Sequence, residues 1–227
     1  SFTENWEKLE RYDNNAPKTM NAHLHVLEAY TLLYQCWKDN GLKKRLEFCV
    51  DLFMNRIYDP SRRHFNLFFD NEWNSLVEMD SYGHDVETGW LLCEAARTLE
   101  NQDLIEQTNQ LALDVTEACL AEGMSDKGYM IYEKKGDRKT KHASWWGQIE
   151  TVIACVNAWQ ISGSDVYLQS VDTVWTFVKD HMVDKEYGEW YSDCFDGEPK
   201  KEAPKVSMWR CPYHTVRLGV EMYNRLK

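Results

Sequence analysis

A short hairpin followed by a helix recurs three times along this chain, and this repetition strongly constrains the fold. Each expected hairpin is rich in aromatic residues, and each following helix opens with a cluster of His, Trp and Glu. The hairpins span 63–73, 128–137 and 187–197, and the helix openings span 82–90, 144–150 and 209–217. Phe65, Tyr129 and Glu189 align as equivalent positions, 64 and then 60 residues apart. Repeated units of this size bury their apolar faces by stacking on their neighbours.

Apolar residues recur with a helical period in seven segments of the chain. Four of them carry the polar and aromatic openings and span 18–36, 83–99, 144–160 and 212–226. The other three are plainly amphipathic and span 41–57, 104–121 and 165–181. In the segment 41–57, for example, Leu42, Leu46 and Phe53 share one face, opposite Lys43 and Glu47. The predicted order is therefore inner helix, outer helix, hairpin, and then the next inner helix.

The inner helices are apolar nearly all round, as expected of helices that are covered on both sides. The first inner helix is interrupted by one polar stripe, formed by Asn21, His25 and Glu28. Such a stripe is costly on a buried helix unless it lines a wet cavity, which favours an α/α toroid over an open solenoid. Four inner and three outer helices cannot close that ring. We therefore predict an all-α fold in a single domain, 1–227, forming the C-terminal part of an (α/α)6 barrel.

Composition excludes several classes of partner. The formal charge of −11 and a pI near 5.1 argue against a nucleic-acid partner, which requires a basic face. No apolar run reaches the roughly 18 residues that a membrane span requires. The seven Cys form no C-x-x-C pair and fall mostly in helical segments, a pattern typical of a reducing compartment. We therefore expect a cytosolic protein with neither a membrane nor a nucleic acid as its partner.

The helix opening at 82–90 contains the first candidate for acid–base chemistry. His84 and Glu87 are three residues apart at a helix start, within reach of a hydrogen bond. A carboxylate partner orients an imidazole and raises its basicity, as a general base requires. A surface histidine beside a glutamate that favours the helix dipole fits this pair equally well. The neighbouring Tyr82 and Trp90 favour the interpretation as a site.

Two further histidines open equivalent helices. His214 follows Pro212, which suits the first turn of a helix. Taken alone it has the character of a hydrogen-bonded core histidine, and only its place in the repeat favours a site. His25 shares its polar stripe with Asn21, whereas His23 lies about 200° away around the helix. His25 is therefore the candidate, and we expect His23 to pack elsewhere.

A flat aromatic face is predicted at the third helix opening. Trp145 and Trp146 stand beside Glu150, which follows one turn later. Stacking combined with a hydrogen-bonding carboxylate suits a sugar ring, although core packing accounts for one of the two Trp equally well. Trp209 extends this platform from the start of the last helix opening.

A metal site is an alternative to acid–base chemistry for the same residues. His25, His84, Glu87 and His214 could in principle make a His₃Glu metal set. However, the chain contains no H-E-x-x-H or similar chelating pair, and these side chains come from three separate helices. It also lacks a G-x-S-x-G nucleophile motif and a phosphate-cradling glycine loop. We therefore predict neither a metal nor a cofactor.

Four segments resemble those of a known family. K-T-M-N-A-H-L-H-V-L-E-A-Y-T-L-L-Y, G-H-D-V-E-T-G-W, W-W-G-Q-I-E and W-R-C-P-Y-H-T-V-R are similar to motifs of the cellobiose 2-epimerases, in the N-acylglucosamine 2-epimerase superfamily. The resemblance covers essentially the whole chain in the same order. It implies an (α/α)6 barrel of which this chain supplies about the last seven helices. It also implies cofactor-independent inversion at C2 of the reducing-end glucose of a β-1,4-linked disaccharide.

The resemblance also implies roles for particular residues. His84 and His214 resemble the two acid–base histidines, and Glu87 resembles the carboxylate that supports His84. His25 resembles a third histidine near the ring oxygen, and Asn21 a sugar contact. The positions that resemble substrate-binding residues are Trp90, Trp146, Glu150 and Trp209.

The chain also departs from the family pattern. The arginine that steadies the enediolate comes from the early helices of the family and has no counterpart in this chain. Arg210 stands where lysine is common, and Ile149 where alanine is common. An isolated chain of this length can therefore be inactive even with all of its histidines in place.

Three alternatives remain open at this point. An aldose–ketose isomerase of the same superfamily shares the enediolate but returns the proton to C1. An N-acylglucosamine 2-epimerase is a second alternative, which the K-T-M-N-A-H-L-H segment disfavours. A non-catalytic sugar-binding module would use the same Trp-rich cavity. The expected partner is a small sugar, most simply a disaccharide, and the sequence leaves the oligomeric state open.

Overall fold

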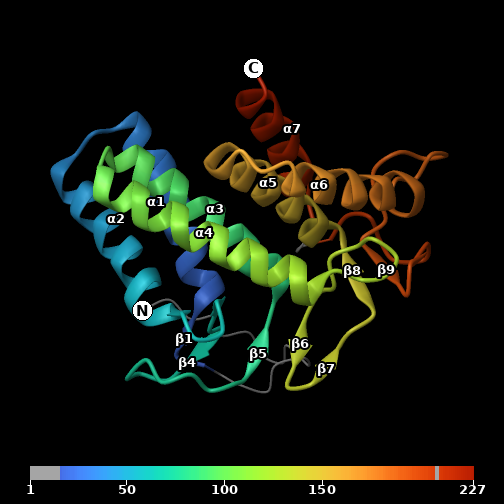
Figure 1. Cartoon of the computed structure of the whole chain (residues 1–227), viewed down its shortest axis with the longest axis horizontal. Coiled ribbons are helices and arrows are strands. Elements are labelled where there is room, and N and C mark those ends of the chain that lie inside the picture. Colours follow the sequence, from blue (N-terminus) through green and yellow to red (C-terminus); the bar gives the residue numbers. More distant parts are fainter. Residues whose placement is uncertain (1–15, 208–209) are drawn as a thin grey trace. The chain divides into compact units, whose positions relative to one another are not determined.

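The computed structural model describes residues 16–207 and 210–227 (Figure 1). Two compact units can be distinguished. The first contains the chain up to Asp80 together with Leu91–Leu111, and the second contains Ser81–Trp90 together with Ala112–Lys227. The single domain expected from the sequence stays a prediction.

Helices dominate both units, and the seven helical segments predicted from apolar spacing are confirmed. They are α1 (Met20–Cys36), α2 (Asn40–Leu52), α3 (Tyr82–Leu99), α4 (Gln102–Gly123), α5 (Trp145–Ser162), α6 (Val166–Phe177) and α7 (Tyr213–Arg225). Two of the outer helices, α2 and α6, continue into a π-helical turn, at Phe53–Ile57 and Val178–Met182. These π-helical turns fall in the last part of the two helical spans predicted from the sequence. The two repeats therefore end their outer helices in the same way.

The first unit is built on α1 and α2, which pack against each other. Strand β1 (Lys18–Thr19) pairs with β4 (Phe68–Phe69), and β2 (Tyr58–Asp59) pairs with β3 (His64–Phe65), both antiparallel. A further short strand, β5 (Met79–Asp80), ends this part of the chain. The Thr19 hydroxyl accepts a hydrogen bond from the Ala22 amide at 3.2 Å and so begins α1. The inner face of α1 is fully buried at Met20, Leu24 and Leu27.

In the second unit, α5 is the central element and packs against both α6 and α7. Every residue from Gly147 to Ala158 is buried, as predicted for a helix that is covered all round. Strands β8 (His142–Ser144), β9 (Asp193–Phe195) and β10 (Glu198–Pro199) form an antiparallel sheet, and β6 (Lys134–Lys135) pairs with β7 (Arg138–Lys139). Strand β8 leads directly into α5, because the Ser144 hydroxyl accepts a hydrogen bond from the Gly147 amide at 3.2 Å.

The turns after the outer helices share one hydrogen-bond pattern, which corrects the repeat alignment. The residue after each helical segment pairs with one a few positions later: Tyr58 with Phe65, Met124 with Met130, and Val183 with Trp190. By this pattern Tyr129 and Glu189 correspond to His64, so the predicted equivalence with Phe65 is wrong by one residue. Aromatic character alone does not define register, because successive strand residues point to opposite faces.

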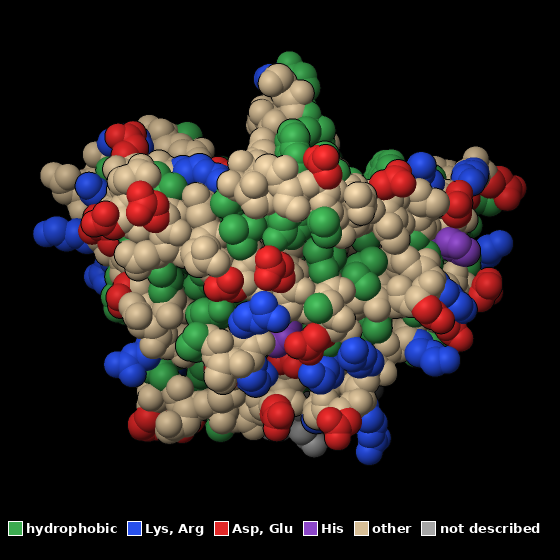
Figure 2. All heavy atoms as spheres, in the orientation of Figure 1, with side chains coloured by type: hydrophobic (Ala, Val, Ile, Leu, Met, Phe, Trp, Pro, Cys, Tyr) green, Lys and Arg blue, Asp and Glu red, His purple; other side chains and the backbone are tan. Residues whose placement is uncertain are grey.

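Helix α7 differs from α5 in leaving apolar side chains uncovered by the described residues. Val216, Val220 and Tyr223 follow one another at helical spacing and are all exposed, whereas Leu218 is buried. Figure 2 shows hydrophobic side chains gathered on this helix, at the top of the view. No described helix combines the length and the apolar character that a membrane span needs.

The starts of α3 and α5 approach so closely that only glycine fits between them. A Cβ atom on Gly83 would lie 2.7 Å from Cζ3 of the Trp146 indole and 3.1 Å from the Cα of Gly147. The missing side chain of Gly83 therefore sets the position of Trp146 relative to the first turn of α3.

We predict that Gly83→Ala lowers the free energy of unfolding by about 1–3 kcal/mol, because the indole or the backbone of α5 must move. The control is Gly219→Ala in α7, where a Cβ would have no neighbouring atom within 4 Å. That helical substitution should be neutral or stabilise by up to about 1 kcal/mol. Urea unfolding of the two variants measures the contrast. Equal stabilities would contradict the close approach of α3 and α5.

Candidate active site

The first turn of α3 positions His84. Its Nδ1 lies 2.8 Å from the hydroxyl oxygen of Ser81, the residue immediately before the helix. In α1 and α5 the corresponding hydroxyls of Thr19 and Ser144 bind a backbone amide three residues along. The support of this imidazole by Glu87 stays a prediction, and the Ser81 hydroxyl is a contact that the sequence did not predict. The sequence signal for this contact was a serine just before the helix and three residues ahead of the histidine.

The indole of Trp146, at the start of α5, contacts two imidazoles that are far apart in the sequence. Its ring centroid lies 4.6 Å from that of His84 and 5.7 Å from that of His214. Trp145 approaches His214 edge-on, with ring centroids 6.2 Å apart. The second unit therefore brings together both histidines predicted for acid–base chemistry, around an aromatic face.

A buried carboxylate orients His214. Its Nδ1 lies 2.7 Å from Oε1 of Glu150, one turn into α5. The other oxygen of Glu150 accepts a hydrogen bond from the indole N–H of Trp90 at 3.0 Å. An acceptor on Nδ1 assigns the proton to that nitrogen, and Nε2 is then the nitrogen able to exchange a proton with a ligand.

Arg217 carries the positive charge of this site. Its guanidinium donates to Oε1 of Glu150 at 2.7 Å and also to Oε1 of Glu87. The side chain of Arg217 is 9% exposed, and those of Glu87 and Glu150 are 2% and 0% exposed. Arg217 follows His214 by three residues, and no role was predicted for it from the sequence. The carboxylate predicted to serve His84 is thus engaged by an arginine from α7.

The protonation of Glu150 follows from its surroundings. Complete burial disfavours its charged form, but the charge of Arg217 and the hydrogen bond from His214 outweigh that cost and hold the pKa of the Glu150 carboxyl below its ordinary value. Glu150 is therefore ionised at neutral pH and accepts the hydrogen bond from His214.

We assign no metal ion to this cluster. Ligand atoms of Glu87, Glu150 and His214 lie within 4.8 Å of one another, a spacing that suits a cation. The guanidinium of Arg217 already bonds to both carboxylates and supplies the positive charge there. Its charge would oppose the entry of a metal ion.

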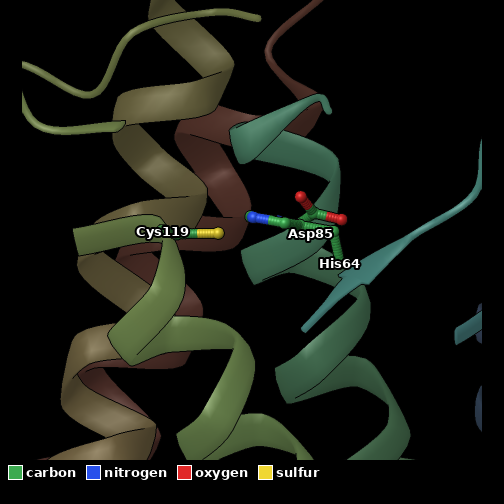
Figure 3. Close-up of side chains that lie close together, drawn as sticks. All are labelled: His64, Asp85 and Cys119. Atoms are coloured by element: carbon green, nitrogen blue, oxygen red, sulfur yellow. The ribbon is translucent and has the colours of Figure 1, made fainter. Parts of the chain in front are cut away.

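Asp85 and Cys119 are fully buried side chains of the same unit, drawn from α3 and α4 in Figure 3. The thiol of Cys119 lies 3.9 Å from the carbonyl oxygen of Tyr82 and so supports the first turn of α3. His64, also labelled there, lies buried on β3 of the first unit.

A partly buried pair that was not predicted from the sequence supports Trp146 from another direction. His142 in β8 hydrogen-bonds through Nε2 to Asp193 in β9. Burial disfavours the charged form of Asp193, but the His142 hydrogen bond outweighs it and lowers the pKa of the carboxyl. The ring of Tyr132 lies 4.7 Å from His142 and 6.0 Å, edge-on, from Trp146. Strand pairing joins these residues across 51 positions, which no local motif reveals.

Two of the remaining predicted residues belong to the first unit. Asn21 and His25 lie on α1 of the first unit, where His25 is exposed and its Nδ1 lies 3.3 Å from Glu28. His23 is buried, with Nδ1 2.6 Å from the Thr19 carbonyl oxygen, so it packs inside as the helical spacing predicts. Trp209 lies outside the described residues.

We predict that Glu150→Gln lowers the free energy of unfolding by about 3 kcal/mol or more at neutral pH, because it breaks a buried ion pair. The folded-state pKa of Glu150 is depressed, so the stabilisation is present above its ordinary value of 4.5. It is lost as the pH falls below 4.5 and through the folded-state pKa. The wild type and the variant should therefore converge in acid.

Urea unfolding between neutral pH and pH about 3 tests this convergence. Glu202→Gln is the control, because Glu202 is an exposed carboxylate of the same unit. It should change stability by less than about 0.5 kcal/mol at any pH. A Glu150→Gln difference that is independent of pH would show that lost packing, not lost charge, is the cause.

Comparison with known proteins shows the family to which the chain belongs. Residues 2–217 match the family described as N-acylglucosamine 2-epimerase (GlcNAc 2-epimerase). Cellobiose 2-epimerases of Bacteroides fragilis and Dictyoglomus turgidum are 40% identical over 220 residues and 35% identical over 231 residues. These alignments cover 95% and 99% of the chain but only 55% and 59% of the relatives. The chain therefore spans a little over half the length of the curated relatives it matches.

Solved structures support the predicted fold class. Cellobiose 2-epimerase of Bacillus thermoamylovorans aligns with a TM-score of 0.91 and 35% identity, over 96% of this chain and 56% of that one. A D-mannose isomerase shares the fold alone, at a TM-score of 0.59 and 13% identity. The predicted fold, an incomplete (α/α)6 arrangement of seven helices with short hairpins, is thereby confirmed. Its place in the C-terminal part of the barrel stays a prediction.

Proposed function

We propose that this chain, which belongs to the N-acylglucosamine 2-epimerase family, carries the acid–base histidines of a sugar 2-epimerase acting on cellobiose-type β-1,4-linked disaccharides. The observation that carries the proposal is the convergence of His84 and His214 on Trp146 within one unit. Because the chain spans little more than half the length of its relatives, the activity is proposed for the complete natural protein.

The proposed chemistry inverts C2 of the reducing-end glucose to give mannose. After ring opening, one imidazole removes the C2 proton, a cis-enediolate forms, and a proton returns to the opposite face of C2. Imidazoles can both accept and donate protons near neutral pH. His84 and His214 come from separate helices, so they can serve opposite faces of one intermediate. No redox change occurs, and the reaction needs no cofactor.

Trp146 is proposed to hold the sugar while its reacting end rearranges. An indole that contacts both imidazoles places a stacked ring close to both of the proton-transferring groups. Trp145 and Trp209 are proposed to extend this face toward the second sugar. From the resemblance, Asn21 is proposed as a sugar contact, and His25 as the group near the ring oxygen.

Glu150 and Trp90 are proposed to orient His214 and not to contact the sugar. Both oxygens of Glu150 are engaged within the protein, Oε1 by His214 and Arg217 and Oε2 by Trp90. Trp90 is 2% exposed, and its indole N–H is taken by Glu150. This refines the roles expected from the resemblance, which placed both residues among the sugar contacts.

We predict that the complete protein incorporates deuterium at C2 of cellobiose in heavy water, and that His84→Ala or His214→Ala slows this exchange by at least about 100-fold. The loss is expected because each variant lacks one proton-transferring group. NMR of the recovered sugar measures the incorporation. His181→Ala is the control, since His181 is an exposed histidine of the same unit.

The products separate the alternatives. A mannosyl product supports the epimerase, whereas a ketose product would identify an aldose–ketose isomerase. Turnover of N-acetylglucosamine in place of cellobiose would identify the third enzyme class. Binding of cellobiose by calorimetry, with no exchange in the wild type, would favour a non-catalytic module. Retained exchange in both histidine variants would overturn the assignment of His84 and His214.

A further inference from the structure

We propose that Arg217 is a positioning residue of this acid–base site, which holds Glu150 as a carboxylate aimed at His214 and thereby fixes Nε2 as the reactive nitrogen of that imidazole. The inference rests on the proposed function and deepens it. It concerns a residue for which no role was predicted from the sequence.

The hydrogen-bond geometry supports this role first. Nη2 of Arg217 lies 2.7 Å from Oε1 of Glu150 and 3.2 Å from Nδ1 of His214, and it also bonds to Glu87. A guanidinium nitrogen at this position carries two hydrogens, so it cannot donate to three partners at once. The two carboxylates take both hydrogens, because charge-assisted bonds are the stronger ones. Nδ1 of His214 then keeps its own proton and donates it to Glu150.

Charge gives the second argument. Glu150 is completely buried, and burial alone would favour its protonated form. A protonated Glu150 could donate to Nδ1 of His214, which would move the imidazole proton to Nε2. The nitrogen proposed to take a proton from the sugar would then be blocked. The positive charge of Arg217 prevents this exchange of tautomers.

The guanidinium is itself held rigidly. Its carbon lies 5.2 Å from the ring centroid of Trp90 and 4.5 Å from that of Tyr213. Nη1 also donates to the Tyr213 hydroxyl at 2.6 Å. A lysine could replace the charge at this site but not the planar contacts or the paired hydrogen bonds. Arg217→Lys and Arg217→Met therefore separate charge from geometry.

Several titratable or charged groups surround His214, and any change in its protonation must be judged against all of them. They are Glu150 from α5, Glu87 from α3, Arg217 and Tyr213 from α7, His84 across Trp146, and Arg210 across Trp145. Of these, Arg217 alone bonds to both carboxylates among the described contacts.

The test reads the tautomer directly. The chain is labelled with ¹⁵N-histidine, and the imidazole nitrogens of His214 are followed by NMR at mildly alkaline pH, with His214→Ala used for assignment. The wild type should show the Nδ1–H form. Arg217→Met should shift the population toward Nε2–H, and Arg217→Lys should retain mostly Nδ1–H with weaker ordering. Tryptophan fluorescence checks that each variant is folded, and Arg217→Gln, which also removes the charge, replaces the methionine variant if that variant is unfolded.

Arg225→Met is the matched control. Arg225 is another arginine of α7 over the Trp90 ring, at 5.6 Å, and it bonds to Glu221 and Asn157. Its loss should leave the His214 tautomer unchanged. If the folded, uncharged Arg217 variant keeps the wild-type tautomer, or if Arg225→Met shifts it equally, the proposal is overturned.

Kinetics of the complete protein add a second readout. Arg217→Met should lower kcat by about 10²-fold or more with little change in KM. The wrong tautomer of His214 impairs proton transfer, whereas the contacts that bind the sugar remain. The acid limb of its kcat profile should also move to higher pH, since Glu150 then binds a proton more readily. A uniform loss of activity with an unmoved profile would indicate only a structural role. A complete protein without C2 exchange would refute the proposed function, while the tautomer result would still decide the role of Arg217.

Discussion

Burial of three charges in one place is the constraint on which the second unit depends. The guanidinium of Arg217 lies between Glu87 and Glu150, and its charge favours the ionised form of the fully buried Glu150. The three side chains come from α7, α3 and α5, so the starts of these helices must meet in one register. The contact of Gly83 with Trp146 provides the close approach of α3 to α5 that such a meeting requires.

The two imidazoles of the site are supported in different ways. His84 meets a serine hydroxyl, which can either donate or accept a hydrogen bond. His214 meets an ionised carboxylate, which can only accept. Two titratable groups in unlike surroundings can take unlike roles, one as base and the other as acid, in a reaction that moves a proton between two faces. The asymmetry originates in the local sequence, since it depends on a serine before α3 and a glutamate within α5.

Local patterns predicted most of the fold, and long-range pairing accounts for what they missed. Apolar spacing located the seven helices of the described residues, because burial periodicity is encoded within each segment. The hairpin register was wrong by one residue, since aromatic side chains do not report which strand residues face inward. His84 and His214 were identified from their place in the repeat. The pairing of Glu87 with Arg217 was not, because it joins residues 130 positions apart whose contact only the packing of helices creates.

The hydroxyl oxygen of Ser81, the residue before α3, bears on both the start of the helix and the reactivity of the site. Ser81 stands where a helix generally accepts serine, threonine, aspartate or asparagine with little loss of stability. Its hydroxyl, however, is also the neighbour of the His84 imidazole. Threonine, asparagine and aspartate can also begin a helix, but they would place a methylated hydroxyl, an amide or a full negative charge beside that ring. A substitution of Ser81 that leaves the fold intact would thus alter the basicity of the site. Homologues that differ only at this position need not share a pH optimum.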